Sequence, residues 1–240
     1  MQSVRSSTLL VGMLVLLLPA GGCGGGEQGS GSATATATPA ATGSDGQTGD
    51  ATTADSEQPG EQVISTGGPI GPPVQTEGGK GLPSCADMNT PISKATLSAA
   101  ATSARCIING LRRRRGIRKL KDNAKLRTAA SKHAKDMVSK GYFSHVSKDG
   151  RTFVARISSA GYTQGATAWT IGENLAWGTG SRSTPASIVQ AWLDSPGHRK
   201  NMFNRRYREA GMAVAFGAPT RSASAGASGT YVDEFGTTSH

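Results

Sequence analysis

The sequence lacks an apolar run long enough to cross a bilayer. Its one candidate, Leu9 to Leu18, is about half of the roughly 20 residues that a membrane-spanning helix needs. The sequence also lacks the His-Glu-x-x-His motif of zinc peptidases and the Gly-x-Ser-x-Gly turn of serine hydrolases. It shows no internal repeat, and its three cysteines do not have the spacing of a metal site. These absences argue against several enzyme classes and against a repeat architecture.

The short apolar run is typical of a signal-peptide core. Arg5 precedes it, and small residues follow it up to Cys23. This arrangement resembles a bacterial lipobox, which implies removal of residues 1–22 and lipidation of Cys23. Ala20 departs from the leucine that is usual three residues before the cysteine, so the alternative is an ordinary signal peptide with an incidental cysteine. Both readings predict an extracytoplasmic protein, either lipid-anchored in the cell membrane or secreted.

Residues 23–82 contain almost no large apolar side chains. They are mainly Gly, Ser, Thr, Ala, Pro, Gln and acids, and such a segment cannot bury enough surface to offset its ordering entropy. We therefore expect a disordered linker ahead of one folded domain at residues 83–240. A flexible linker of this length would reach roughly 40–45 Å on average.

The net charge of +10 conceals an asymmetry between linker and domain. Residues 24–82 carry seven acids and one base, whereas residues 83–240 carry 24 bases and nine acids, a net charge of +15. A strongly basic domain favours anionic partners. Outside a cell these are anionic lipid head groups or envelope polymers rather than nucleic acid. The alternative is a solvated basic face without a dedicated partner.

Two cysteines remain if Cys23 is lipidated. Cys85 and Cys106 form an even pair in an oxidising compartment, which permits a disulfide. It would close a loop of about 22 residues and stabilise the fold by on the order of 3 kcal/mol. Two buried free thiols are the alternative.

The periodicity of the basic part predicts four helices followed by two strands. Apolar residues recur at three- and four-residue steps in the helical segments, glycines end three of them, and Thr184-Pro185 is a helix-start signal. Later the period changes to two. We expect an α+β domain with helices packed on a small antiparallel sheet. The expected helices are 93–115, 123–140, 152–160 and a segment from 184 to just before 196, and the expected strands are 212–216 and 231–235.

Four short strings contain polar residues suited to a site. They are Gly141-Tyr142-Phe143-Ser144-His145, Gly172-Glu173-Asn174-Leu175-Ala176, the string from Trp192 through His198 to Met202, and Tyr207-Arg208-Glu209-Ala210-Gly211-Met212. Each is weak by itself. His145 could be a surface histidine, Glu173 could cap a turn, and His198 could bond a helix end. His133, four residues before Met137, is better explained as a satisfied helix histidine than as a ligand.

Together and in this order, the strings resemble the CAP superfamily, also called the SCP domain, and its bacterial branch in particular. The resemblance extends from about Cys106 to Phe235. It implies a three-layer α-β-α sandwich with a cleft lined by two histidines and two acids, sometimes occupied by a divalent metal. Here the tetrad would be His145, Glu173, His198 and, less securely, Glu209. The two histidines would be the metal ligands, and zinc is a suitable cation for imidazoles and carboxylates.

The last expected strand departs from the family pattern. It often reads Tyr-Trp-Thr-Gln-x-Phe-Gly, whereas this chain has Tyr231-Val232-Asp233-Glu234-Phe235-Gly236, without the tryptophan and with two added acids.

The sequence supports three hypotheses for function. The first is a non-catalytic module that binds a lipid, a small ligand or the cell envelope. It uses the cleft together with a basic cluster, made of Arg112, Arg113, Arg114, Arg115, Arg118 and Lys119. The second is a metal-dependent hydrolase, peptidase-like, that uses the same tetrad. The third is a structural envelope protein with a vestigial cleft. We favour the first, in which the lipid anchor and the basic cluster act at one anionic surface.

Overall fold

The computed structural model describes residues 61–63, 81–220 and 227–240. The chain separates into two units, residues 1–53 and 54–240, and all described residues belong to the second. The expected signal peptide, Cys23 and most of the expected linker lie outside the described residues. In the described ranges no helix combines the length and apolar character needed to span a membrane.

The elements are β1 (Glu61–Val63), α1 (Leu97–Arg114), β2 (Lys121–Asp122), α2 (Ala124–Lys140), α3 (Phe153–Ser159), β3 (Ala168–Thr179), the 3-10 helix η1 (Gly180–Ser183), α4 (Pro185–Asp194), α5 (Pro196–Phe203), β4 (Glu209–Phe216) and β5 (Ser228–Ser239).

The strands form one five-stranded sheet in the order β1-β3-β5-β4-β2. Its three long strands are antiparallel, with Glu173 of β3 opposite Glu234 of β5 and Gly211 of β4 opposite Glu234 on the other side. The short strands β1 and β2 add to the two edges in parallel. The sheet is therefore mixed, which corrects the expected antiparallel one. The strand β1 comes from the segment that we expected to be a featureless linker.

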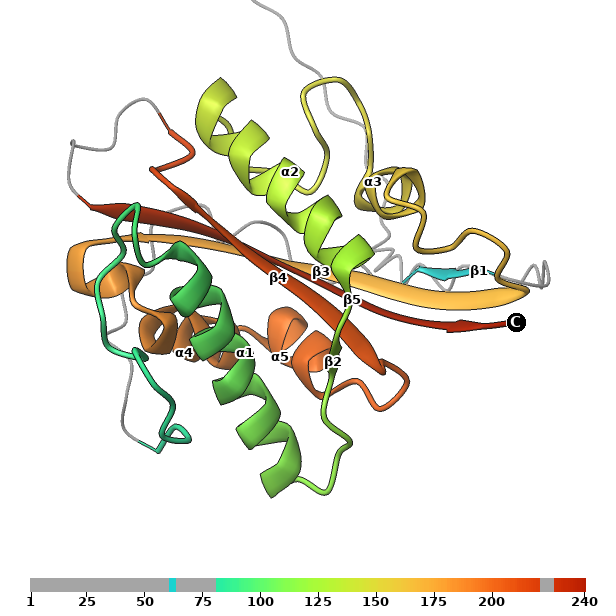
Figure 1. Cartoon of the computed structure of the whole chain (residues 1–240), viewed down its shortest axis with the longest axis horizontal. Helices are drawn as coiled ribbons and strands as arrows, with labels where there is room; N and C mark the ends of the chain where they lie inside the picture. Colours follow the sequence, from blue (N-terminus) through green and yellow to red (C-terminus); the bar gives the residue numbers. More distant parts are fainter. Residues whose placement is uncertain (1–60, 64–80, 221–226) are drawn as a thin grey trace, which may run out of the picture. The chain divides into compact units, whose positions relative to one another are not determined.

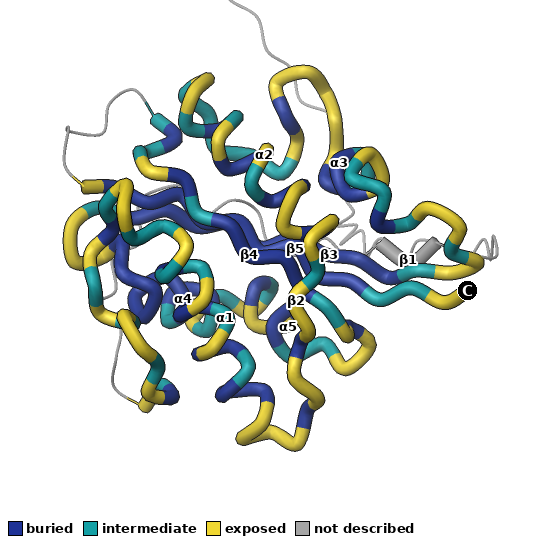
Figure 2. The backbone as a smooth tube through the Cα atoms, in the orientation of Figure 1, coloured by how far each residue is buried: buried dark blue, intermediate teal, exposed yellow. Residues whose placement is uncertain are grey.

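The sheet lies between two helical layers, with α2 and α3 on one face and α1, α4 and α5 on the other (Figure 1). Strand side chains alternate between the two faces. On β4, Met212 packs with the α1 layer, whereas Ala213 packs with α2. The three long strands are buried along most of their length, and exposure is concentrated on the outer sides of the helices and the loops (Figure 2). The expected α+β class and three-layer sandwich are confirmed.

Helix boundaries follow local capping signals where these exist. The Asn123 side chain accepts hydrogen bonds from two backbone N–H groups at the start of α2, and Gly141 ends this helix with a left-handed φ of 62°. Thr184 caps α4 in the same way as Asn123 caps α2. The first helix begins later than expected, at Leu97. The helix α5 was missed because Pro196 was interpreted as a stop, whereas it occupies the first turn of a new helix.

A glycine allows α2 to pack directly on the sheet. A Cβ atom at Gly211 of β4 would lie 2.0 Å from the backbone nitrogen of Arg127. Only glycine fits such an approach of helix backbone to strand backbone. This contact fixes α2 against the sheet beside the strands that carry the candidate site.

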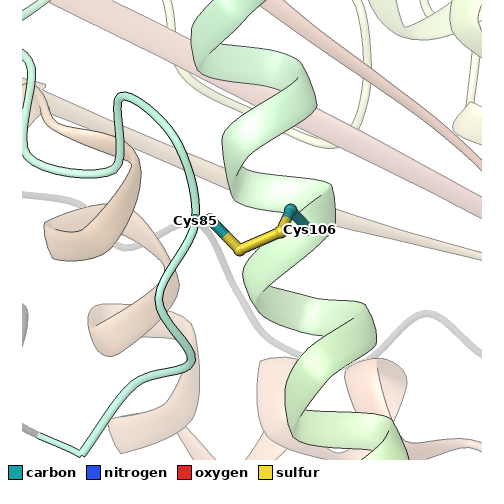
Figure 3. The surroundings of a disulfide bond; sticks show 2 residues. All are labelled: Cys85 and Cys106. Carbon is teal, nitrogen blue, oxygen red and sulfur yellow. A yellow bond between two sulfur atoms is a disulfide. The ribbon is translucent and has the colours of Figure 1, made fainter.

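The predicted covalent link is present between Cys85 and Cys106 (Figure 3). Cys85 lies in the segment that precedes α1, and Cys106 lies within α1, 21 positions further along the chain. The alternative of two free thiols is thereby excluded. The disulfide fastens the entry segment of the domain to its first helix.

Replacing both cysteines tests what this link contributes. Cys85→Ser combined with Cys106→Ser should lower the free energy of unfolding by about 3 kcal/mol, because the unfolded chain regains the entropy of the closed loop. Denaturant titration of both proteins measures the difference. A reducing agent should destabilise the wild type by a similar amount and leave the variant unaffected. A variant as stable as the wild type would contradict the prediction.

Candidate functional site

The site begins with a carboxylate that β3 directs toward the layer of α2 and α3. Glu173 is fully buried, and its Oε1 atom lies 2.6 Å from Nδ1 of His145. His145 follows the glycine end of α2, and its side chain keeps 13% of its surface exposed. The sheet thus holds the acid rigidly, while the histidine that contacts it comes from a loop and reaches solvent.

Arg156 provides the second contact of Glu173. Its Nη2 atom donates to Oε2 of Glu173 at 2.6 Å, and its Nη1 atom donates to the backbone carbonyl of His145 at 2.9 Å. Nη1 also donates to the Ser147 hydroxyl and to the carbonyl of Arg151. One guanidinium group therefore neutralises the buried carboxylate and holds the loop that carries His145. The sequence analysis assigned Arg156 no place in the site.

These contacts keep Glu173 ionised. Burial alone would raise its pKa, but the hydrogen bond from His145 and the charge of Arg156 outweigh burial and lower the pKa below its usual value. The carboxyl of Glu234 lies opposite on β5 and is also fully buried. Burial and the negative charge of Glu173 raise its pKa well above the usual range. The pair therefore consists of one ionised and one protonated carboxyl group.

A second histidine lies beside this pair of carboxyl groups. His133 of α2 is buried, and its Nε2 atom lies 2.9 Å from the Ser144 carbonyl and 4.0 Å from Oε2 of Glu173. Burial lowers its pKa to about 4, so the ring is neutral at pH 7 and its Nε2–H donates to the carbonyl. The sequence interpretation of His133 as a satisfied helix histidine holds for Nε2 alone, because Nδ1 is buried without a hydrogen-bond partner among the described residues. It also did not anticipate the closeness to Glu173.

His198 approaches from the opposite helical layer. It lies on α5, and its Nδ1 atom is 2.7 Å from the Ser195 hydroxyl, while Nε2 is buried without a hydrogen-bond partner among the described residues. Burial, reinforced by the nearby His145, lowers its pKa to about 4. Asn174, next to Glu173 on β3, donates to the His198 carbonyl. Asn201 of the same helix donates to the Glu173 carbonyl, so α5 is attached to the part of β3 that carries Glu173.

Glu209 is engaged elsewhere. Its carboxylate accepts hydrogen bonds from the Asn123 amide at 3.0 Å and from the Tyr162 hydroxyl at 2.8 Å. The strand register explains this, because Glu209 stands opposite Gly236, two positions along β5 from Glu234. The acid that faces Glu173 across the strand pair is therefore Glu234, which corrects the placement of Glu209 in the tetrad.

The donor set does not match a complete zinc site. Catalytic zinc takes three protein ligands and keeps one position open. Within the described ranges, no group of three or more His, Cys, Asp and Glu side chains is arranged to hold a metal ion. Both oxygens of Glu173 already contact His145 and Arg156. The expected tetrad therefore offers a metal ion only two ligands here, the imidazoles of His145 and His198. These residues do not fit a resident zinc as they stand, and no metal-dependent step follows from their geometry.

The basic cluster divides into one buried and several exposed members. Arg112 is fully buried, and its guanidinium group donates to four backbone carbonyls, including those of Met202 and Asn204 at the end of α5. Burial, with the charge of Arg208, lowers its pKa to about 10, so it stays charged at neutral pH. Arg112 is therefore a structural residue, which corrects its assignment as a contact with an anionic surface. The exposed members are Arg113, Arg114, Arg115, Arg118 and Lys119.

Fold and site together define an α-β-α sandwich with a buried His/Glu/Arg cluster at one long strand. The sequence profile of the Cysteine-rich secretory protein family, CAP, matches residues 107–232. This is more than half of the chain, and the protein therefore belongs to this family, as the sequence strings predicted.

Two curated relatives come from Bacillus subtilis (strain 168). The uncharacterized protein YkwD is 30% identical over 132 residues, which cover 54% of this chain and 49% of YkwD. The uncharacterized membrane protein YlbC is 34% identical over 108 residues, 45% of this chain and 29% of YlbC. The chain thus spans half or less of the length of these relatives.

Two solved structures resemble this chain at low sequence identity. An outer surface protein from Borrelia burgdorferi has a TM-score of 0.49 and 22% identity, and the match covers 63% of this chain and 99% of that one. An extracellular protein with an SCP domain from Bacillus anthracis str. Ames has a TM-score of 0.47 and 24% identity, with coverage of 60% and 44%.

A further buried acid lies on the other face of β5. Asp233 is fully buried, and its Oδ1 atom has no hydrogen-bond partner among the described residues. Burial raises its pKa to about 8, and the charges of Arg105 and Arg112 oppose this only in part. The folded protein therefore keeps the Asp233 proton at neutral pH, whereas the unfolded chain loses it near pH 4.

This acid should make stability depend on pH. Between about pH 4 and 8 the folded state binds the proton and the unfolded state does not, so the free energy of unfolding falls as pH rises through this window. Asp233→Asn should remove this dependence and stabilise the protein at pH 8 by on the order of a few kcal/mol relative to wild type. Denaturant titrations at pH 5, 6.5 and 8 measure it. A difference between the two proteins that stays constant with pH would refute the prediction.

Proposed function

We propose that this protein is an exported, membrane-tethered binding module whose basic end contacts anionic lipid head groups or an anionic envelope polymer. The observation that carries the proposal is that exposed cations from two distant segments meet at one end of the domain. Arg205 donates to the carbonyls of Gly116 and Arg115, about ninety residues earlier in the chain. This contact adds three further exposed cations, Arg205, Arg206 and Arg208, to the five exposed members of the cluster. Their role was not apparent from the sequence.

The arrangement suits a surface better than a point ligand. The buried Arg112 donates hydrogen bonds to the carbonyls of Arg118, Asn204 and Tyr207, which lie in the two loops that carry the exposed cations. These bonds hold the two loops in place. Arg115 also lies over the Phe203 ring, 3.9 Å from its centre. Each cation near an anionic membrane contributes about 1 kcal/mol. Several of them together could hold a domain that the proposed lipid on Cys23 already keeps near the membrane. The relative YlbC, named a membrane protein, is in keeping with this placement.

Vesicle binding tests the proposal. Changing Arg113, Arg118 and Lys119 to serine should weaken binding to vesicles of 30% phosphatidylglycerol in phosphatidylcholine about 100-fold, since three charges contribute about 3 kcal/mol in total. Sedimentation of vesicles with the full chain carrying Cys23→Ser, which removes the anchor from the measurement, gives the affinity. Wild-type binding should also fall as salt rises.

Two controls sharpen this test. Changing Lys125, Lys132 and Lys135 on α2 to serine removes the same charge elsewhere and should have a much smaller effect. Arg112 is left unchanged, because removing a buried guanidinium group would damage the fold. Equal loss in both triple variants would show a general charge effect, and unchanged binding in the first would sink the proposal.

The alternative function is a metal-dependent hydrolase that uses His145 and His198. The buried Nε2 atom of His198, without a partner among the described residues, is the observation in its favour. It requires a third ligand beyond the two imidazoles. We expect the purified full chain to contain less than one tenth of an equivalent of zinc by elemental analysis, and His145→Ala to leave any residual peptidase or esterase signal unchanged. Stoichiometric metal lost in His198→Ala, together with activity lost in His145→Ala, would establish the alternative instead.

A further inference from the structure

One edge of the sheet is open along most of its length. The short strand β2 pairs with only the first two residues of β4, Glu209 and Ala210. From Gly211 to Phe216, no described strand pairs with the outer edge of β4. Such an edge presents unpaired backbone donors and acceptors to any extended chain that reaches it.

Hydrogen bonds at both ends of β4 show which backbone groups face outward. The Ala210 carbonyl accepts from the N–H of Asn123, which lies on the outer side, whereas the N–H of Gly217 donates inward to Ser228 of β5. Backbone groups alternate in direction along a strand. Those of Met212 and Val214 therefore point to the outer edge.

A groove with a volume of about 500 Å³ lies along this edge, with β4 as its floor, α1 as one wall and α2 as the other. Figure 1 shows β4 running between these two helices. The α1 wall and the floor are mainly apolar, and the α2 wall carries hydroxyl groups and cations. The lining consists of Leu97, Ser98 and Ala101 from α1, Met212, Ala213 and Val214 from β4, and Arg127, Thr128, Ser131, Lys132 and Lys135 from α2.

The charge in the groove is of one sign. Arg127 is ion-paired with Asp122, but Lys132 and Lys135 are exposed and form no ion pair within the part of the chain that the structure describes. No acidic residue lines the groove. An anionic occupant would therefore meet two cations at one wall, whereas a cationic one would be repelled.

We propose that this groove binds an extended peptide segment of another protein in which acidic and apolar residues alternate, and which adds a strand to β4. Backbone pairing with the free edge would supply affinity without sequence preference. Specificity follows from the period of two: successive side chains of an added strand point to opposite faces. One set would face Leu97 and Ala101 on the α1 wall, and the other would face Lys132 and Lys135 on the α2 wall. The six residues from Gly211 to Phe216 set the length of the pairing segment.

A pair of synthetic peptides tests the alternation directly. The probe is a fluorescein-labelled peptide with the core Asp-Val-Glu-Val-Asp-Val, and its comparison has the same composition in blocks, Asp-Asp-Glu-Val-Val-Val. Fluorescence anisotropy with the full chain in non-ionic detergent should show at least tenfold tighter binding of the alternating peptide. A third peptide has N-methyl groups on alternate residues and therefore lacks the backbone N–H donors that pair with a strand edge. It should bind at least tenfold more weakly, and this comparison requires no change to the protein.

Charge reversals locate the site and separate this proposal from the proposed function. Lys132→Glu with Lys135→Glu should weaken binding of the alternating peptide at least tenfold. Arg113→Glu with Lys119→Glu changes the net charge equally at the basic end and should leave peptide binding within twofold. The proposal is overturned if the block peptide binds as tightly, if N-methylation has no effect, or if the two double variants lose binding equally. Vesicle binding can fail without affecting any of these results.

Discussion

The ionised carboxylate of Glu173 lies inside the domain, and its need for partners constrains the positions of α3 and of the loop after α2. Glu173 lies on the long strand β3 and has no exposed surface, and an unpaired charge there would be strongly destabilising. Arg156 and His145 each contact it at 2.6 Å. To do so, α3 must lie over the strand and the loop after α2 must fold back onto it. The position of the His145–Glu173–Arg156 cluster is thus a consequence of satisfying a buried charge.

A second buried charge organises the opposite layer by the same principle. Arg112 on α1 meets no carboxylate within hydrogen-bonding distance among the described residues, and its donors are satisfied by backbone carbonyls from the 118 loop, the end of α5 and Tyr207. Carbonyls at a helix C-terminus are a favourable environment for a cation. Arg112 thus holds in place the loop after α1 and the loop after α5. These two loops carry the exposed cations.

The sequence predicted those features that local chemistry determines. The caps of α2 and α4 depend on single residues, Asn123, Gly141 and Thr184, and their helices were placed correctly. The long strand β3 was not recognised, because a strand buried on both faces shows no alternation, and its glycines, Glu173 and Asn174 have low strand propensity. Residues that act through long-range pairing were also missed. Glu234 joins the site only through the register of β5, and nothing local distinguishes the buried Arg112 from the exposed arginines that follow it.

The helix α2 lies between the buried His/Glu/Arg cluster and the groove, which raises the question of whether the two communicate. Its inner side presents His133 toward Glu173, while the neighbouring Lys132 lines the groove at the edge of β4. A ligand at one place could influence the other only if α2 had two arrangements available. The packing at Gly211 opposes this, because the backbone of α2 already meets the strand where no Cβ atom would fit. A helix held so closely has little room to shift as a unit. The geometry therefore favours two independent sites on one rigid sandwich, so that an occupant of the groove would leave the His145–Glu173 contact undisturbed.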